Sequence, residues 1–222
     1  MFSYAGRTAS PVAQPLPTRV GGFGGIAGLV AYLLEQGIER VVDATHPFAA
    51  QMSCNAVEAC AKAGVPLAAF ERAPWQAGPG DDWRHVPDME GAVAALPEAP
   101  NRVFLAIGKQ NLAGFADRAQ HHYLVRLVDP PDAPLPFRNV EVVIARGPFE
   151  AAEDQALMQD RAIDMVVAKN SGGTGAEAKL QAARALGLPV VMIDRPIVPA
   201  RPVFARLSDI LHWLDHSARL GV

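Results

Sequence analysis

Asp43, Thr45 and His46 are the first residues along the chain whose types and spacing could carry chemistry. They follow the apolar pair Val41 and Val42 and stand next to Pro47, whose fixed φ suits the first turn of a helix. This pattern predicts a buried parallel strand that passes directly into a helix. Ligands bind at such a turn in open α/β sheets, where a carboxylate, a hydroxyl and an imidazole can contact them. The alternative is that Asp43 and Thr45 only cap the helix.

A second candidate loop covers residues 169–175, with the sequence KNSGGTG. It follows an apolar run over residues 165–168 and precedes a helical pattern over residues 176–186. The backbone amides of a glycine-rich turn can bind an anion, and Lys169 adds a positive charge beside them. The loop lacks the G-x-x-x-x-G-K-[ST] pattern of a P-loop, which disfavours nucleotide hydrolysis. A glycine-rich connection with a solvated lysine is the alternative for this loop taken alone.

Three further turns could take part in binding. Residues 19–25, RVGGFGG, place four glycines around Phe23 just before an apolar helix, although their spacing does not match G-x-G-x-x-G. Strands ending near Gly108 and Arg146 deliver two more polar turns. A long segment over residues 71–83 contains Pro, Gly and two tryptophans, which indicates a substrate-facing loop or an interdomain seam. Surface packing of the tryptophans is the alternative.

The elements that must position these turns alternate between strand and helix. Strands are expected over residues 2–5, 40–44, 66–70, 103–107, 123–128, 140–145, 165–168 and 189–193. Helices are expected over residues 26–34, 47–63, 89–96, 150–161, 176–186 and 208–218, the last with Ser208 as its N-cap. The break PEAP at residues 97–100 predicts two α/β domains, 1–97 and 98–222, with mostly parallel sheets facing each other across a cleft.

Composition excludes several classes of protein. The chain has 222 residues, 50% of them hydrophobic and 19% charged, which is typical of a soluble globular protein. A formal net charge of −3 gives no basic surface for nucleic acid. Cys54 and Cys60 stand near no His or third Cys at ligand spacing, so we expect neither a metal site nor a disulfide, and a reducing, cytoplasmic compartment. No apolar run reaches the ~20 residues of a membrane span.

Taken in order, several segments together resemble the precorrin-6A reductase family of cobalamin biosynthesis. They are RVGGFGG, VVDATHPFAAQMSCNA, ERAPW, AIGKQNLAGFA, RGPF and AKNSGGTGAEAKLQAARALGLPVVMIDRP. The resemblance implies two Rossmann-like domains that use reduced nicotinamide, NADPH or NADH, to reduce the macrocycle of precorrin-6A or its cobalt-bearing counterpart. It also implies a small-molecule tetrapyrrole as the substrate and neighbouring cobalamin-pathway enzymes as partners.

The site residues follow from this chemistry. Hydride transfer requires alignment of two flat rings and exclusion of water, and His46 and Lys169 are the candidate proton donors. Cofactor binding is expected of Gly21, Gly22, Phe23, Gly24, Gly25, Asp43, Ala44, Thr45, His46 and Pro47. Binding of the substrate, which bears many carboxylates, is expected of Arg7, Lys109, Arg146, Lys169, Asn170, Ser171, Gly172, Gly173 and Lys179.

One departure from the family pattern concerns the start of the chain. Members usually begin with a strand and a turn of the kind GGT-x-E-(A/G) before the stretch found here as Ala5, Gly6 and Arg7. We therefore expect such a unit upstream of Met1, and weak cofactor binding without it. A reductase of another small molecule, a two-domain binding protein without chemistry and an α/β methyltransferase are the alternative functions.

Overall fold

The computed structural model describes residues 1–4 and 15–216, which form two compact units. The first unit comprises Met1–Glu71 and Ile197–Val222, and the second unit comprises Arg72–Pro196. This division differs from the boundary expected at residue 97. The reason is that residues 83–86 and 203–204 form short strands, which the local sequence does not indicate. Residues 83–86 pair within the second unit, and the chain end returns to the first.

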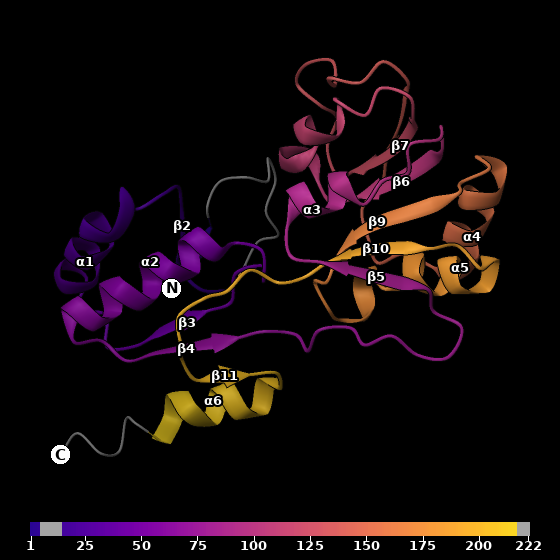
Figure 1. The fold of residues 1–222 in the computed structure, drawn as a ribbon. Coiled ribbons are helices and arrows are strands. Elements are labelled where there is room, and N and C mark those ends of the chain that lie inside the picture. Colours follow the sequence, from indigo (N-terminus) through magenta and orange to yellow (C-terminus); the bar gives the residue numbers. More distant parts are fainter. Residues whose placement is uncertain (5–14, 217–222) are drawn as a thin grey trace. The chain divides into compact units, whose positions relative to one another are not determined.

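The first unit contains two small parallel sheets. Strands β1 (Phe2–Tyr4) and β2 (Thr18–Val20) pair with each other, and a three-stranded sheet has the order β11-β4-β3. Its remaining elements are α1 (Gly25–Glu35), β3 (Val41–Asp43), α2 (Ala50–Ala63), β4 (Leu67–Phe70), β11 (Val203–Phe204) and α6 (Leu207–His216). Helices α1 and α2 pack side by side through Leu29, Leu33, Ala56, Ala59 and Cys60 (Figure 1).

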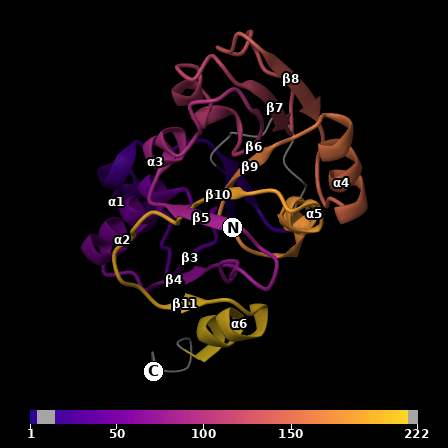
Figure 2. The ribbon, with the colours of Figure 1, turned by 45° about the vertical axis from the view of Figure 1, so that its right-hand side comes forward.

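The second unit is built on a six-stranded sheet with the order β5-β10-β9-β6-β7-β8. Its strands are β5 (Trp83–Val86), β6 (Arg102–Ala106), β7 (His122–Leu127), β8 (Val140–Ile144), β9 (Met165–Lys169) and β10 (Val190–Ile193). Its helices are α3 (Met89–Ala94), α4 (Ala151–Asp160) and α5 (Ala178–Leu186), with 3-10 turns η1 (Lys109–Asn111), η2 (Ala113–Phe115) and η3 (Thr174–Ala176). Helices α4 and α5 pack against each other (Figure 2).

Every strand pairing in the described part of the chain is parallel, which confirms the predicted α/β class. The central strands β6 and β9 are fully buried at Phe104, Leu105, Val166 and Val167, as expected for a parallel sheet covered on both faces. Parallel pairing also places the carboxyl ends of β6, β8 and β9 at one edge of this sheet. The loops beginning at Gly108, Arg146 and Lys169 therefore share that edge.

Element boundaries differ from expectation mainly at helix starts. Helix α2 begins at Ala50 rather than Pro47, because a tight turn precedes it in which Ala49 N donates to His46 O over 2.7 Å. Helix α6 begins at Leu207, so Ser208 lies inside it rather than at its N-cap. No helix among residues 1–4 and 15–216 is long and apolar enough to cross a membrane.

Candidate functional site

The turn after β3 is ordered by its own polar side chains. Asp43 Oδ1 accepts hydrogen bonds from Thr45 N over 3.1 Å and from Thr45 Oγ1 over 2.7 Å. Thr45 Oγ1 also lies 3.2 Å from Ser53 Oγ in α2. Asp43 is only 6% exposed, whereas Ala44 and His46 are exposed. Asp43 and Thr45 therefore shape the turn from within, and the backbone of residues 44–47 forms its outer surface.

His46 is held in one ring orientation. Its Nδ1 accepts a hydrogen bond from Phe48 N over 3.2 Å, and its ring lies 5.8 Å from that of Phe48. An accepting Nδ1 places the proton of the neutral imidazole on Nε2. His46 Nε2 then carries the ring hydrogen and can donate a hydrogen bond to a ligand at this turn.

Arg201 supports the turn, and sequence reasoning did not find it. Its guanidinium pairs with Glu71 and places Nη2 3.9 Å from Asp43 Oδ2. The Arg201 side chain is 8% exposed, so a buried cation faces two carboxylates behind the turn. Burial and the Asp43 charge raise the pKa of the nearby Cys60 thiol to about 11. Arg201 lies more than a hundred residues after Asp43, and no local pattern indicates that they meet.

The glycine turn before α1 leaves its backbone accessible. Gly24 is the N-cap of α1 with φ 78°, a conformation that glycine adopts without strain. A Cβ added at Gly21, Gly22, Gly24 or Gly25 would meet no atom within 4 Å. Arg19 lies 4.0 Å over the ring of Phe23 and donates to the carbonyls of Gly21 and Gly22 over 2.9 and 3.0 Å. The turn is therefore fixed by Arg19 and open to a ligand at the helix N-terminus.

In the second unit, the loop over residues 169–175 is bound to the segment at Trp75. Asn170 Oδ1 accepts from Trp75 N over 2.8 Å, and Asn170 Nδ2 donates to Trp75 O over 3.1 Å. Trp75 Nε1 donates to Gly173 O over 2.9 Å. Asn170 and Trp75 are 5% and 8% exposed, so these bonds lie inside the protein. The Asn170 amide, which the sequence assigns to the substrate, is engaged by backbone.

Gly172 and Gly173 are required for two reasons: their backbone conformation, and the short distance between their backbone and residues 72–73. Their φ values are 68° and 78°, in the left-handed region. A Cβ on Gly172 would lie 2.0 Å from Ala73 O, and one on Gly173 would lie 2.5 Å from Arg72 Cδ. The two glycines thus allow the strand-end loop to pack directly against residues 72–73.

The two lysines of this region differ in position. Lys169 ends β9 at the carboxyl edge, and burial lowers its pKa. Lys179 is 4% exposed, donates to Ala176 O and lies 4.8 Å from the ring centroid of Trp75. Desolvation, with a smaller contribution from Arg126, lowers the Lys179 pKa to about 8. The Lys179 ammonium, which the sequence assigns to the substrate, is therefore buried inside the second unit and bonded to its backbone.

The remaining predicted cations lie on exposed loops. Lys109 Nζ pairs with Asp132 over 2.7 Å, and Arg146 Nη2 pairs with Asp129 over 3.4 Å. A Cβ added at Gly147 would lie 3.2 Å from Gly175 O, so the loop after β8 reaches the loop after β9. Arg7 lies outside the described residues.

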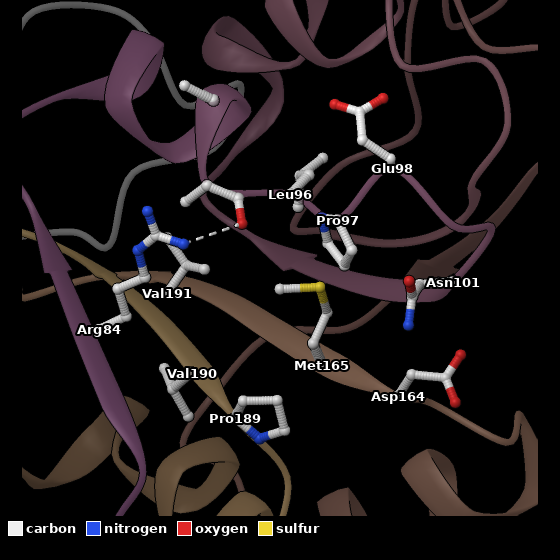
Figure 3. Close-up of a pocket in the computed structure, with 12 residues that line it drawn as sticks. Arg84, Leu96, Pro97, Glu98, Asn101, Asp164, Met165, Pro189, Val190 and Val191 are labelled. Atoms are coloured by element: carbon white, nitrogen blue, oxygen red, sulfur yellow. Dashed lines mark hydrogen bonds between the residues drawn. The ribbon is translucent and has the colours of Figure 1, made fainter.

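A cavity of about 480 Å³ lies at the opposite edge of the six-stranded sheet. It is lined by the amino ends of β5, β9 and β10, including Arg84, Met165 and Val190 (Figure 3). Arg84 points toward Ala95 O at 3.5 Å, and Glu98 and Asp164 flank the other side. None of the residues predicted for cofactor or substrate lines this cavity.

Comparison with known proteins shows the family of the chain. Residues 1–215 match the profile of the family described as precorrin-6x reductase CbiJ/CobK. The chain belongs to this family. It is 65% identical over 219 residues to a precorrin-6A reductase of Rhodobacter capsulatus, covering 98% of this chain and 87% of that one.

Two further members of the CbiJ/CobK family show how far the similarity extends. A solved structure titled CobK precorrin-6A reductase matches with a TM-score of 0.93 and 65% identity, covering 97% of this chain and 86% of that chain. A cobalt-precorrin-6A reductase of Priestia megaterium is 30% identical over 200 residues, covering 85% of this chain and 77% of that relative. The fold described above is therefore the fold of a solved family member.

Proposed function

We propose that the chain is a nicotinamide-dependent reductase that reduces the precorrin-6A macrocycle by hydride transfer in cobalamin biosynthesis. The observation that carries this proposal is the 65% identity over 219 residues to a protein named precorrin-6A reductase. The Rhodobacter capsulatus relative is far more similar than the 30% identical cobalt-precorrin-6A reductase. On this ground we assign the metal-free macrocycle, rather than its cobalt-bearing counterpart, as the preferred substrate.

The first unit supplies residues that fit a nicotinamide dinucleotide. A Cβ at Gly21, Gly22, Gly24 or Gly25 would occupy open space, so a flat or phosphorylated group can approach this backbone. The first amides of α1 point from the same turn and favour a phosphate. When bound, reduced nicotinamide supplies the hydride. The proposed task of residues 21–25 and 43–47 is to hold and orient that cofactor.

We propose NADPH rather than NADH as the cofactor. Arg19 places a guanidinium at the glycine turn, where a positive charge favours the additional phosphate of NADPH. Replacing Arg19 with Gln should raise the KM for NADPH more than the KM for NADH. An equal effect on both cofactors would assign Arg19 to the turn alone.

The proposed roles in the second unit are substrate binding and proton delivery. Lys169, at the end of β9, carries a charge beside a turn built of Ser171, Gly172 and Gly173, which suits a substrate carboxylate. Lys109 and Arg146 add charge on the neighbouring strand-end loops. His46 Nε2 and Lys169 Nζ are the proposed proton donors to the reduced ring. Asn170 and Lys179 hold the loop in place instead of contacting substrate.

The direct test mixes the purified chain with precorrin-6A and reduced nicotinamide. Loss of the nicotinamide absorbance band, together with the spectral change of the macrocycle, is the expected result. Cobalt-precorrin-6A serves as the comparison substrate and should give a lower kcat/KM. Tight binding of precorrin-6A without cofactor oxidation would contradict the proposal and favour a binding protein.

A further inference from the structure

Arg72 lies directly against the glycine turn of the second unit. Its aliphatic stem crosses Gly173, since an added Cβ there would lie 2.5 Å from Arg72 Cδ, 3.3 Å from Cγ and 3.4 Å from Nε. Arg72 is exposed. The absence of a side chain at Gly173 therefore leaves room for the Arg72 stem, which lies over the turn that precedes η3.

Arg72 differs from Lys109 and Arg146 at this sheet edge in its pairing with carboxylates. Lys109 and Arg146 are each paired with an aspartate, at 2.7 and 3.4 Å. Arg72 makes no ion pair with any carboxylate of residues 1–4 and 15–216. An exposed guanidinium held over a glycine turn, with its charge not offset, is suited to bidentate binding of a carboxylate.

The backbone carbonyl of Arg72 is held by the half-buried side chain of Arg195. Arg195 Nη2 donates to Arg72 O over 2.7 Å and to Ser171 O over 3.1 Å, and Arg195 Nε donates to Asn170 O over 2.9 Å. The two hydrogen bonds between Asn170 and the backbone of Trp75 fix the same segment three residues further on. Residues 72–75 and 170–173 are thus joined at both ends.

We propose that Arg72 binds a carboxylate of the tetrapyrrole substrate, and that Asn170 is a positioning residue that holds Arg72 over Gly173. This inference rests on the proposed function, because the carboxylates belong to that substrate. It assigns a substrate contact to Arg72 and gives Asn170 a role that needs no contact with substrate. Loss of either residue should weaken substrate binding and leave cofactor binding intact.

The first experiment compares Arg72→Gln and Arg72→Lys with the parent chain. Loss of a charge-assisted hydrogen bond should raise the KM for precorrin-6A about tenfold to a hundredfold in Arg72→Gln. Arg72→Lys should recover part of that loss, because it keeps the charge but not the planar fork. The KM for the nicotinamide should stay within about twofold. Arg84→Gln, an exposed arginine at the opposite sheet edge, is the matched control and should change neither KM.

The role of Asn170 is tested by a double-mutant cycle. Asn170→Ala removes both bonds to Trp75, and Asn170→Asp keeps the acceptor but loses the donor, so it serves if the alanine variant does not fold. Each should raise the KM for precorrin-6A in the parent chain but add little in the Arg72→Gln background. Fully additive effects would show that Asn170 acts independently of Arg72 and would overturn its positioning role.

Binding of uroporphyrin, a porphyrin with eight carboxylates, separates this inference from the proposed function. Fluorescence titration should show weaker binding by Arg72→Gln than by the parent chain and Arg84→Gln. If the parent chain reduces precorrin-6A while Arg72→Gln keeps both its KM and its porphyrin affinity, the inference fails and the proposed function stands. If Arg72→Gln loses porphyrin affinity but the parent chain does not reduce precorrin-6A, Arg72 keeps its role and the proposed function fails.

Discussion

Replacing Lys179 with Met should remove a pH-dependent part of the stability of the second unit. Lys179 is 4% exposed and its pKa is lowered from 10.5 to about 8, chiefly by desolvation. In the unfolded chain the amine has its ordinary pKa, so between pH 8 and 10.5 the unfolded state binds more protons than the folded state. Stability therefore rises with pH across this window. The contribution of the neutral Lys179 is lost as pH falls from 10.5 through 8.

The magnitude follows from the two pKa values of Lys179. A difference of about 2.5 at 1.36 kcal/mol per pKa unit makes the charged amine cost the folded state roughly 3 kcal/mol at pH 7. Lys179→Met keeps much of the stem and removes this cost, while losing the bond to Ala176 O and the contact with the Trp75 ring. We therefore expect the variant to be close to the parent chain in stability at pH 7 and less stable at pH 10.

The assay is urea unfolding followed by tryptophan fluorescence at several pH values between 7 and 10. Trp75 and Trp83 report on the second unit, and the quantity of interest is the difference in unfolding free energy between parent chain and variant. Lys62→Met is the control, because Lys62 is exposed and pairs with Glu58 on the same helix. A difference for Lys179→Met that does not change between pH 7 and 10 would refute the assignment of a depressed pKa to this lysine.

Three further substitutions test the architecture of the second unit. Gly172→Ala should lower kcat/KM by at least about tenfold, because its Cβ would lie 2.0 Å from a backbone carbonyl, whereas Gly175→Ala, with no atom within 4 Å, should act as a near-neutral control. Lys169→Met should lower kcat/KM for precorrin-6A by about tenfold to a hundredfold. A raised KM indicates a binding role, whereas a lowered kcat with a changed pH profile indicates proton transfer. Unchanged kinetics would remove Lys169 from the site. Arg126→Met should lower the free energy of unfolding in urea by about 3 to 5 kcal/mol, because it leaves the Asp154 carboxylate, 4% exposed, without its cation; a loss below about 1 kcal/mol would contradict this reasoning.

The sequence by itself determined the strand-to-helix units and the turns between them. The apolar run that ends at Asp43 and the one that ends at Lys169 each became a parallel strand. Strand β9 is buried, as its continuous apolar residues predict. Strand β3 lies at the edge of its sheet, and its Val41 and Val42 are only half-buried. The rule that ligands bind beyond the carboxyl ends of such strands then singled out the turns. The order of the motifs was sufficient to indicate the family.

Only the tertiary structure decided which distant segments meet. Strand β5 joins β10, about a hundred residues away, and Arg201 reaches Asp43, because sheet pairing and ion pairs depend on the folded path of the chain. Lys179 carries no local sign of burial, and its position follows from the packing of α5 beneath Trp75. Asn170 has the chemistry of a ligand-binding amide. Its hydrogen-bonding capacity is used by the Trp75 backbone, ninety-five positions earlier, and a pairing at that separation leaves no periodic trace in the sequence.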